Sequence, residues 1–103
     1  MSRRAPRFQI SLPTTVSPLL GGELVVCHTR DISEVGVCLD TAAWLPVGTR
    51  VSLTFTDPAS GTKLEVIGDV VREVERPQPA LGVLVIEPPA EWKVLVTNAA
   101  RQV

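Results

Sequence analysis

Hydrophobic and polar residues alternate along several short stretches of this chain, with the period of two that is typical of β-strands. The clearest stretch is Arg50–Thr56, in which Val51, Leu53 and Phe55 fall on one face and polar residues fall on the other. The stretches that the same reasoning predicts to be strands are Glu23–Thr29, Gly36–Asp40, Arg50–Thr56, Lys63–Glu75 and Ala80–Ile86, with a sixth at Arg7–Leu12. In the long fourth stretch, Gly68 is expected to mark a bulge or a bend.

Turn-forming residues separate these stretches. The segments PLLGG, TDPASGT and RPQPA combine proline, glycine and small polar residues, which favour turns. All nine prolines fall outside the five stretches with the strongest strand pattern. Because proline lacks the amide hydrogen that a sheet needs, this distribution agrees with the strand assignment.

The hydrophobic period changes to that of an α-helix near the C-terminus. One apolar stripe there consists of Trp92, Leu95, Val96 and Ala99. Two prolines precede the stripe, as is common at the start of a helix. The acidic Glu91 lies in the first turn and the basic Arg101 in the last turn, which is the arrangement that the helix dipole favours. The pattern predicts a helix over Pro89–Gln102. Strands and helix together predict a mainly β fold, a small six-stranded antiparallel β-barrel with a C-terminal α-helix. The expected core residues are Val51, Leu53, Phe55, Val70, Val83, Trp92, Leu95 and Val96.

Composition and charge narrow the class of protein. The 103 residues suit one domain, and 45% hydrophobic with 20% charged residues is ordinary for a soluble globular protein. No apolar run is long enough to span a membrane, and the basic N-terminus lacks the apolar segment of a secretory signal, so a cytoplasmic location is expected. The net charge of -1 and the isoelectric point near 5.7 argue against DNA or RNA as a partner.

Catalytic and metal sites find little support in the sequence. Possible metal ligands gather between residues 27 and 40, but without the paired spacing of a metal site, and adjacent Cys27 and His28 would face opposite sides of a strand. The two cysteines, Cys27 and Cys38, are expected to remain reduced. No nucleophile elbow, phosphate loop or dinucleotide fingerprint is present. We therefore expect no enzyme, no metal and no cofactor.

Arginine is concentrated at the N-terminus, where Arg3, Arg4 and Arg7 account for three of the eight arginines. The spacing Arg3-x-x-x-Arg7 is weak evidence alone, because Arg72 and Arg76 repeat it and solvated surface charge explains either pair. A second stretch, DISEVG at residues 31–36, is also ambiguous. It fits a capping box for one helical turn, with a left-handed glycine at its exit.

Taken together and in this order, the two stretches resemble the signature pair of the PilZ domain family, which binds cyclic di-GMP. They read Arg3-x-x-x-Arg7 and Asp31-x-Ser33-x-x-Gly36, the second directly before a short strand. LPVGTRVSLTF is similar to the family's segment after the second signature, and ALGVLVIEPPAEWKVLV to its last strand and C-terminal helix. The family often has an aromatic residue where Val85 stands. The resemblance covers nearly the whole chain.

The resemblance implies a division of roles among the site residues. Arg3 and Arg7 would contact phosphates and guanines, and the facing part of the site would consist of Asp31, Ser33 and Gly36. For Arg4 two roles are compatible with the resemblance: a solvated neighbour of the site, or a residue that assists in binding phosphate. Arginine suits this ligand because its planar fork pairs with phosphate oxygens or with a guanine edge and stacks on purines. The carboxylate of Asp31 could accept hydrogen bonds from guanine.

The function that follows is a cyclic di-GMP receptor or adaptor without catalytic activity that signals to an effector protein. We expect a flexible arginine-rich arm over residues 1–7 that closes on the ligand, a barrel over 8–87, a C-terminal helix over 88–103, and a monomer or weak dimer. The alternative is a PilZ-like interaction module of motility or envelope machinery that does not bind the nucleotide. A barrel for single-stranded nucleic acid is less suited, because the chain has few aromatic residues and is slightly acidic, whereas such a barrel needs stacking platforms on a basic groove.

Overall fold

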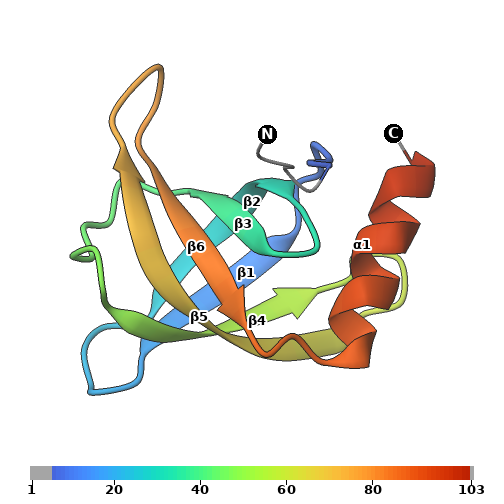
Figure 1. Ribbon diagram of the computed structural model, residues 1–103, viewed down its shortest axis with the longest axis horizontal. Helices are drawn as coiled ribbons and strands as arrows, with labels where there is room; N and C mark the ends of the chain where they lie inside the picture. Colours follow the sequence, from blue (N-terminus) through green and yellow to red (C-terminus); the bar gives the residue numbers. More distant parts are fainter. Residues whose placement is uncertain (1–5, 103) are drawn as a thin grey trace, which may run out of the picture.

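Six antiparallel strands form a closed barrel, with one helix beside it, in a computed structural model that describes residues 6–102 (Figure 1). The elements are β1 (Pro13–Pro18), β2 (Val25–Ile32), β3 (Gly36–Asp40), β4 (Arg50–Thr56), β5 (Lys63–Val74), β6 (Ala80–Ile86) and α1 (Ala90–Gln102). The strands follow the order β1-β2-β3-β6-β5-β4 around the barrel, and β4 closes it against β1. The predicted fold class is confirmed.

The barrel interior holds the apolar faces that the alternation predicted. Val51, Leu53 and Phe55 of β4 are fully buried, while the residues between them are partly exposed. Every expected core residue is buried except Leu95, which is partly buried and packs against the core from α1. The regular inward faces of the strands therefore supply most of the hydrophobic stabilisation.

The predicted first strand was wrong in position, since β1 covers Pro13–Pro18 and not Arg7–Leu12. Proline is tolerated at both ends of this strand because those positions need not donate to the ladder. Its inward residues are Thr14 and Val16, and Thr14 satisfies its hydroxyl by donating to the carbonyl of Leu12. Because Thr14 is polar, this strand does not show the alternation of hydrophobic and polar residues from which the other strands were predicted.

Two further expectations about the strands need correction. Strand β2 begins at Val25 and continues to Ile32, three residues beyond the predicted end, so it contains Asp31. The irregularity of β5 against β6 lies between Val70 and Arg72, and Gly68 is not a bulge. A Cβ atom at Gly68 would lie 2.5 Å from Cγ1 of Val83, so close packing inside the barrel explains this glycine.

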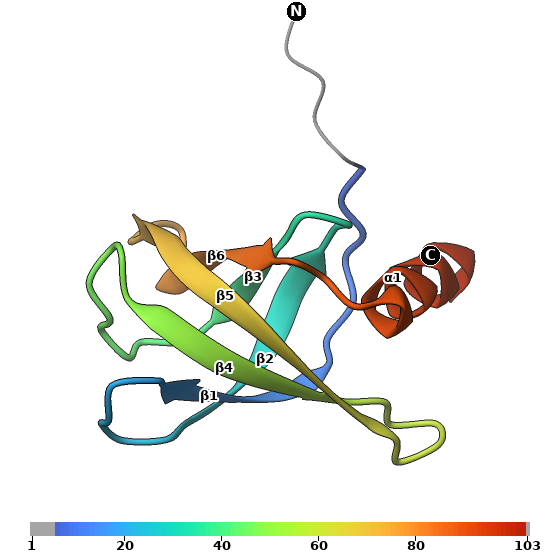
Figure 2. The same cartoon turned by 60° about the horizontal axis from the view of Figure 1, so that its bottom comes forward.

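Helix α1 begins one residue later than predicted and lies beside the barrel (Figure 2). The residues of its apolar stripe pack against the core. Trp92 is fully buried, and its ring lies 5.1 Å from the ring of Phe55, centroid to centroid. The N-terminal segment descends between the barrel and α1 before entering β1 (Figure 2). This path brings Phe8 close to the end of β2.

Candidate functional site

Hydrogen bonds fix residues 8–12 to β2. The amide of Phe8 donates to the carbonyl of Ile32 at 2.8 Å, and the amide of Ile32 donates back to the carbonyl of Phe8 at 3.0 Å. Further along, the amide of Thr29 donates to the carbonyl of Leu12 at 3.0 Å, and the Thr29 hydroxyl donates to the carbonyl of Ile10 and accepts from the amide of Leu12. The bridge leaves Arg7 beside the end of β2.

Arg7 and Asp31 meet across this bridge, so one residue from each signature stretch is brought together. The Nε–H of Arg7 donates to Oδ1 of Asp31 at 2.6 Å, with the two side chains 45% and 21% exposed. Among the residues that the structure describes, the terminal nitrogens of this guanidinium have no hydrogen-bond partner. Arg3 and Arg4 lie outside the described residues. The contact is a partly solvated ion pair that can still accept a further anion or base edge.

Ser33 holds a tight turn between β2 and β3, so the predicted capped helical turn is wrong. Its amide donates to the carbonyl of Gly36 at 2.8 Å, which closes a hairpin with only three residues, Ser33–Val35, between the two strands. Its buried hydroxyl accepts from the amides of Val35 and Gly36 and donates to the carbonyl of Gly36. Because all hydrogen-bonding capacity of the hydroxyl is used, Ser33 shapes the turn and offers nothing to a ligand directly.

Gly36 is required by packing and not by a left-handed conformation. It is the first residue of β3, and its φ angle lies outside the left-handed region. A Cβ atom there would lie 2.7 Å from the carbonyl oxygen of Val83 on β6. The expected left-handed exit is therefore wrong, and this glycine allows β3 and β6 to approach closely.

Other elements hold this turn from two sides. The indole Nε1–H of Trp92 in α1 donates to the carbonyl of Glu34 at 3.1 Å. The amide of Val85 in β6 donates to the carbonyl of Val35 at 2.9 Å. The turn is thereby linked to both the barrel and the helix.

Four residues form a row across the outside of the barrel next to this turn. They lie on β2, β3, β6 and β5 in that order, and they are Asp31, Cys38, Gly82 and Arg72. Cys38 points outward because its neighbours Val37 and Leu39 fill the interior, yet it is only 4% exposed. Side chains around it must therefore cover it.

The pKa of the Cys38 thiol responds to burial and to the charged groups around it. Burial raises the pKa of its thiol, Asp31 raises it further, and Arg30, Arg7 and Arg72 act in the opposite direction. Three guanidinium groups thus act on the pKa of one thiol. Sequence reasoning missed Arg72 as a neighbour of the site, and only the register of four strands could have revealed it.

The predicted separation of Cys27 from His28 is confirmed, since Cys27 is buried and His28 is exposed. Burial, with a smaller contribution from Asp40, raises the pKa of the Cys27 thiol to about 11. Within residues 6–102, no group of three metal-ligating side chains comes together. Arg30 forms an ion pair with Asp40 and also donates to the carbonyl of Gln78.

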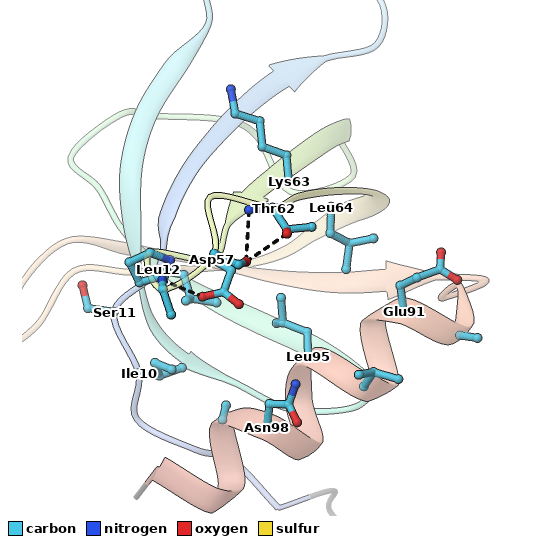
Figure 3. Close-up of a pocket in the computed structure, with 16 residues that line it drawn as sticks. Ile10, Ser11, Leu12, Asp57, Thr62, Lys63, Leu64, Glu91, Leu95 and Asn98 are labelled. Atoms are coloured by element: carbon cyan, nitrogen blue, oxygen red, sulfur yellow. Dashed lines mark hydrogen bonds between the residues drawn. The ribbon is translucent and has the colours of Figure 1, made fainter.

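A cavity of about 620 Å³ lies away from these residues, between α1, the β4–β5 hairpin and residues 10–12 (Figure 3). Its lining is mostly apolar, with Leu12 and Leu95 on facing sides (Figure 3). The charged residues that line it are Asp57, Lys63 and Glu91. Two acids against one base do not suit a doubly negative ligand, so the arginine-bearing outer face remains the candidate site.

In the part of the chain that the structure describes, no helix has the length and apolar character needed to cross a membrane. A comparison with curated proteins found no match. Solved structures do match, at low sequence identity. The motility inhibitor MotI (DgrA) of Bacillus subtilis has a TM-score of 0.81 at 17% identity, covering 99% of this chain and 51% of its own length. The chain thus spans about half of that protein.

Two isolated PilZ domains match over most of both chains. The PilZ domain of YcgR from Escherichia coli, solved with cyclic di-GMP, has a TM-score of 0.75 at 13% identity, covering 99% of this chain and 94% of that one. The PilZ domain of CeSA from a cellulose-synthesizing bacterium has a TM-score of 0.71 at 18% identity, covering 91% and 93%. At these identities the likeness concerns the fold. The sequence model of the PilZ domain matches residues 1–93, and with this match the chain belongs to the PilZ domain family.

Proposed function

We propose that this chain is a receptor for cyclic di-GMP and that the ligand binds on the outer face beside the β2–β3 turn. The observation that carries the proposal is the 2.6 Å contact between Arg7 and Asp31, which joins the two signature stretches in one site. The YcgR domain solved with cyclic di-GMP supports it as a similar fold.

The side chains divide the ligand chemistry between them. Arg7 offers terminal N–H groups to a phosphate or to the O6 and N7 atoms of guanine. Asp31 accepts from the N–H donors of a guanine, which arginine cannot do. Arg3 adds a second fork, and Arg4 assists with phosphate. Ser33 and Gly36 act through the turn, since their contacts hold the backbone that carries Asp31.

The receptor would signal without catalysis. On ligand binding, the arm over residues 1–7 gains phosphate and guanine contacts against the turn, which creates a surface that an effector protein can recognise. The bond from Trp92 to the carbonyl of Glu34 offers a second route, because movement of the turn would act on α1. A cytoplasmic protein that is a monomer or weak dimer fits this role.

Isothermal titration of the purified chain with cyclic di-GMP tests the proposal. We expect saturable binding, and the stoichiometry distinguishes one nucleotide from a stacked pair. Cyclic di-AMP serves as the control, because it retains the phosphates and loses the guanine edges that arginine reads. Absence of binding by a folded chain would overturn the proposal and favour an interaction module of motility or envelope machinery.

A further inference from the structure

The end of the barrel opposite the β2–β3 turn exposes an apolar surface, which we call the apolar end. It is made by the β1–β2 and β3–β4 loops with their flanking residues, on the side of the molecule away from α1 (Figure 1, Figure 2). Six large hydrophobic side chains there are about half exposed or more: Leu19, Leu20, Leu24, Val26, Trp44 and Val47. Leu20 is fully exposed, and 71% of Trp44 is accessible to solvent.

Charge is nearly absent from the apolar end. Residues 18–26 and 41–49 contain one charged residue, Glu23, although a fifth of the whole chain is charged. Arg50, which follows the second segment, forms an ion pair with Asp69 at 2.9 Å. An exposed aromatic residue among aliphatic ones, with few charges around it, is the composition of the centre of a protein–protein interface.

Hydrogen bonds hold the backbone of both loops in place. The amide of Leu19 donates to the carbonyl of Arg50 at 3.0 Å, and the amide of Gly48 donates to the carbonyl of Val70 at 2.7 Å. A hollow of about 460 Å³ lies between the loops, with Trp44 among its lining residues. Because these bonds already order the backbone, association at this surface loses little conformational entropy.

The charge distribution indicates which partner the apolar end fits. In a two-fold symmetric contact a surface meets its own copy, so a patch with net charge repels itself, whereas an almost uncharged patch does not. An anionic membrane instead attracts Lys and Arg, and residues 18–26 and 41–49 contain neither. The exposed Leu20 and the hollow between the loops also offer a projection and a recess to the identical surface of a second copy.

The extent of the apolar end fits a weak dimer. The exposed parts of its six side chains amount to roughly 500 Å², taking about 100 Å² for a fully exposed aliphatic side chain and about 200 Å² for tryptophan. Two copies would thus remove about 1,000 Å² from water, which is the lower limit of specific interfaces.

We propose that the apolar end is a homodimer interface, in which the β1–β2 and β3–β4 loops of two copies pack against each other around a two-fold axis. Leu20 and Trp44 are the side chains that the partner copy buries. The interface lies at the opposite end of the barrel from the contact between Arg7 and Asp31. Dimerisation therefore leaves the candidate ligand site accessible, and the inference is independent of the proposed function.

Sedimentation equilibrium of the full chain over a concentration series, without nucleotide, tests this inference. We expect a monomer at about 1 μM and mostly dimer at about 1 mM, because interfaces at the lower size limit associate weakly. Leu20→Asp is expected to weaken dimerisation at least about tenfold, because it places like charges in the contact. Position 20 is fully exposed in the monomer, so this change does not disturb folding. Val94→Asp, at an exposed position of α1, is the matched control and is expected to dimerise as the wild type does.

Acrylamide quenching of tryptophan fluorescence gives a second measurement. Trp92 is fully buried, so the quenchable indole is that of Trp44, and its quenching is expected to fall as the dimer forms. A wild-type chain that stays monomeric at about 1 mM would overturn the inference. If that monomer instead sediments with vesicles of phosphatidylcholine and phosphatidylglycerol, and Leu20→Asp does not, the apolar end binds a membrane. A dimer that Val94→Asp disrupts and Leu20→Asp does not would also overturn the inference, because the interface would then lie on α1.

Discussion

At the scale of single residues, Arg7 contributes both a charge and a shape. We expect Arg7→Ala to weaken cyclic di-GMP binding by at least about 2 kcal/mol, or roughly 30-fold, by analogy with truncation of one partner in a buried charge pair. Arg7→Lys is expected to recover only part of the loss. Calorimetric titration measures both, with Arg101→Ala in the last turn of α1 as the control. An affinity unchanged by Arg7→Ala would contradict the assignment.

The thiol of Cys27 gives stability a dependence on alkaline pH. Burial raises its pKa to about 11 in the folded protein, above the ordinary value for cysteine of about 8.5. The folded state therefore holds this proton more tightly than the unfolded state. The resulting stabilisation is complete below about pH 8.5 and is lost as the pH rises through about 11.

We therefore expect the free energy of unfolding, measured with urea, to fall between about pH 9 and pH 11. The chain has no tyrosine, so no phenol titrates in the same range. Cys27→Ala is expected to reduce the slope, although Cys38, whose pKa is raised by burial and by Asp31, keeps part of it. An unchanged slope in Cys27→Ala would exclude this thiol as a cause.

At the scale of elements, the β2–β3 turn depends on one hydroxyl. Ser33→Ala removes the acceptor for the amides of Val35 and Gly36. Leaving a buried amide, here that of Gly36, without a partner costs about 1–3 kcal/mol, so we expect a loss of that size in urea unfolding and weaker ligand binding through displacement of the turn. Ser60→Ala, at an exposed position of the β4–β5 hairpin, is the control. Equal effects of the two substitutions would refute this role for Ser33.

The strands that could be predicted are those with one uniformly apolar face, such as β4. Strand β1 could not be, because Thr14 occupies an inward position and prolines stand at its ends. The folded structure explains both features. The hydroxyl of Thr14 donates to the carbonyl of Leu12, and the two ends of the strand do not have to donate an amide hydrogen to the sheet. Local composition does not contain this information.

The candidate site, too, could be predicted only in part from the sequence. The two signature stretches were visible in the sequence, and the structure brings Arg7 and Asp31, one residue from each stretch, into contact. The turn geometry was missed, since Ser33 and Gly36 also fit a capped helical turn when only their spacing is considered. The position of Arg72 near the site could not be predicted, for a different reason. Its neighbour Gly82 follows from strand registers that no short pattern specifies.

At the scale of the whole molecule, we expect the barrel to fold independently of the arm. Deleting residues 1–7 leaves the Phe8–Ile32 bridge and the core intact, and it removes only the partly exposed Arg7–Asp31 ion pair from the described contacts. Such pairs contribute about 0–1 kcal/mol, so the melting temperature is expected to change little.

Binding of cyclic di-GMP by the same truncated chain is expected to be abolished, because Arg3, Arg4 and Arg7 are all lost. Thermal unfolding and titration of one protein preparation give both results. Retained binding would show that the N-terminal arginines are dispensable, and a large loss of stability would show that the arm is part of the fold.

The bond between Trp92 and the turn gives the molecule an intrinsic optical reporter. Only two tryptophans are present, and Trp92 is fully buried whereas Trp44 is 71% exposed. In a Trp44→Phe variant, the fluorescence comes from one indole whose N–H bonds to the carbonyl of Glu34. Ligand-driven movement of the turn would alter the emission wavelength or intensity of that indole. Stopped-flow mixing with cyclic di-GMP could then time the structural response without any label, and an emission that stays constant at saturating ligand would mean that the turn and α1 do not move.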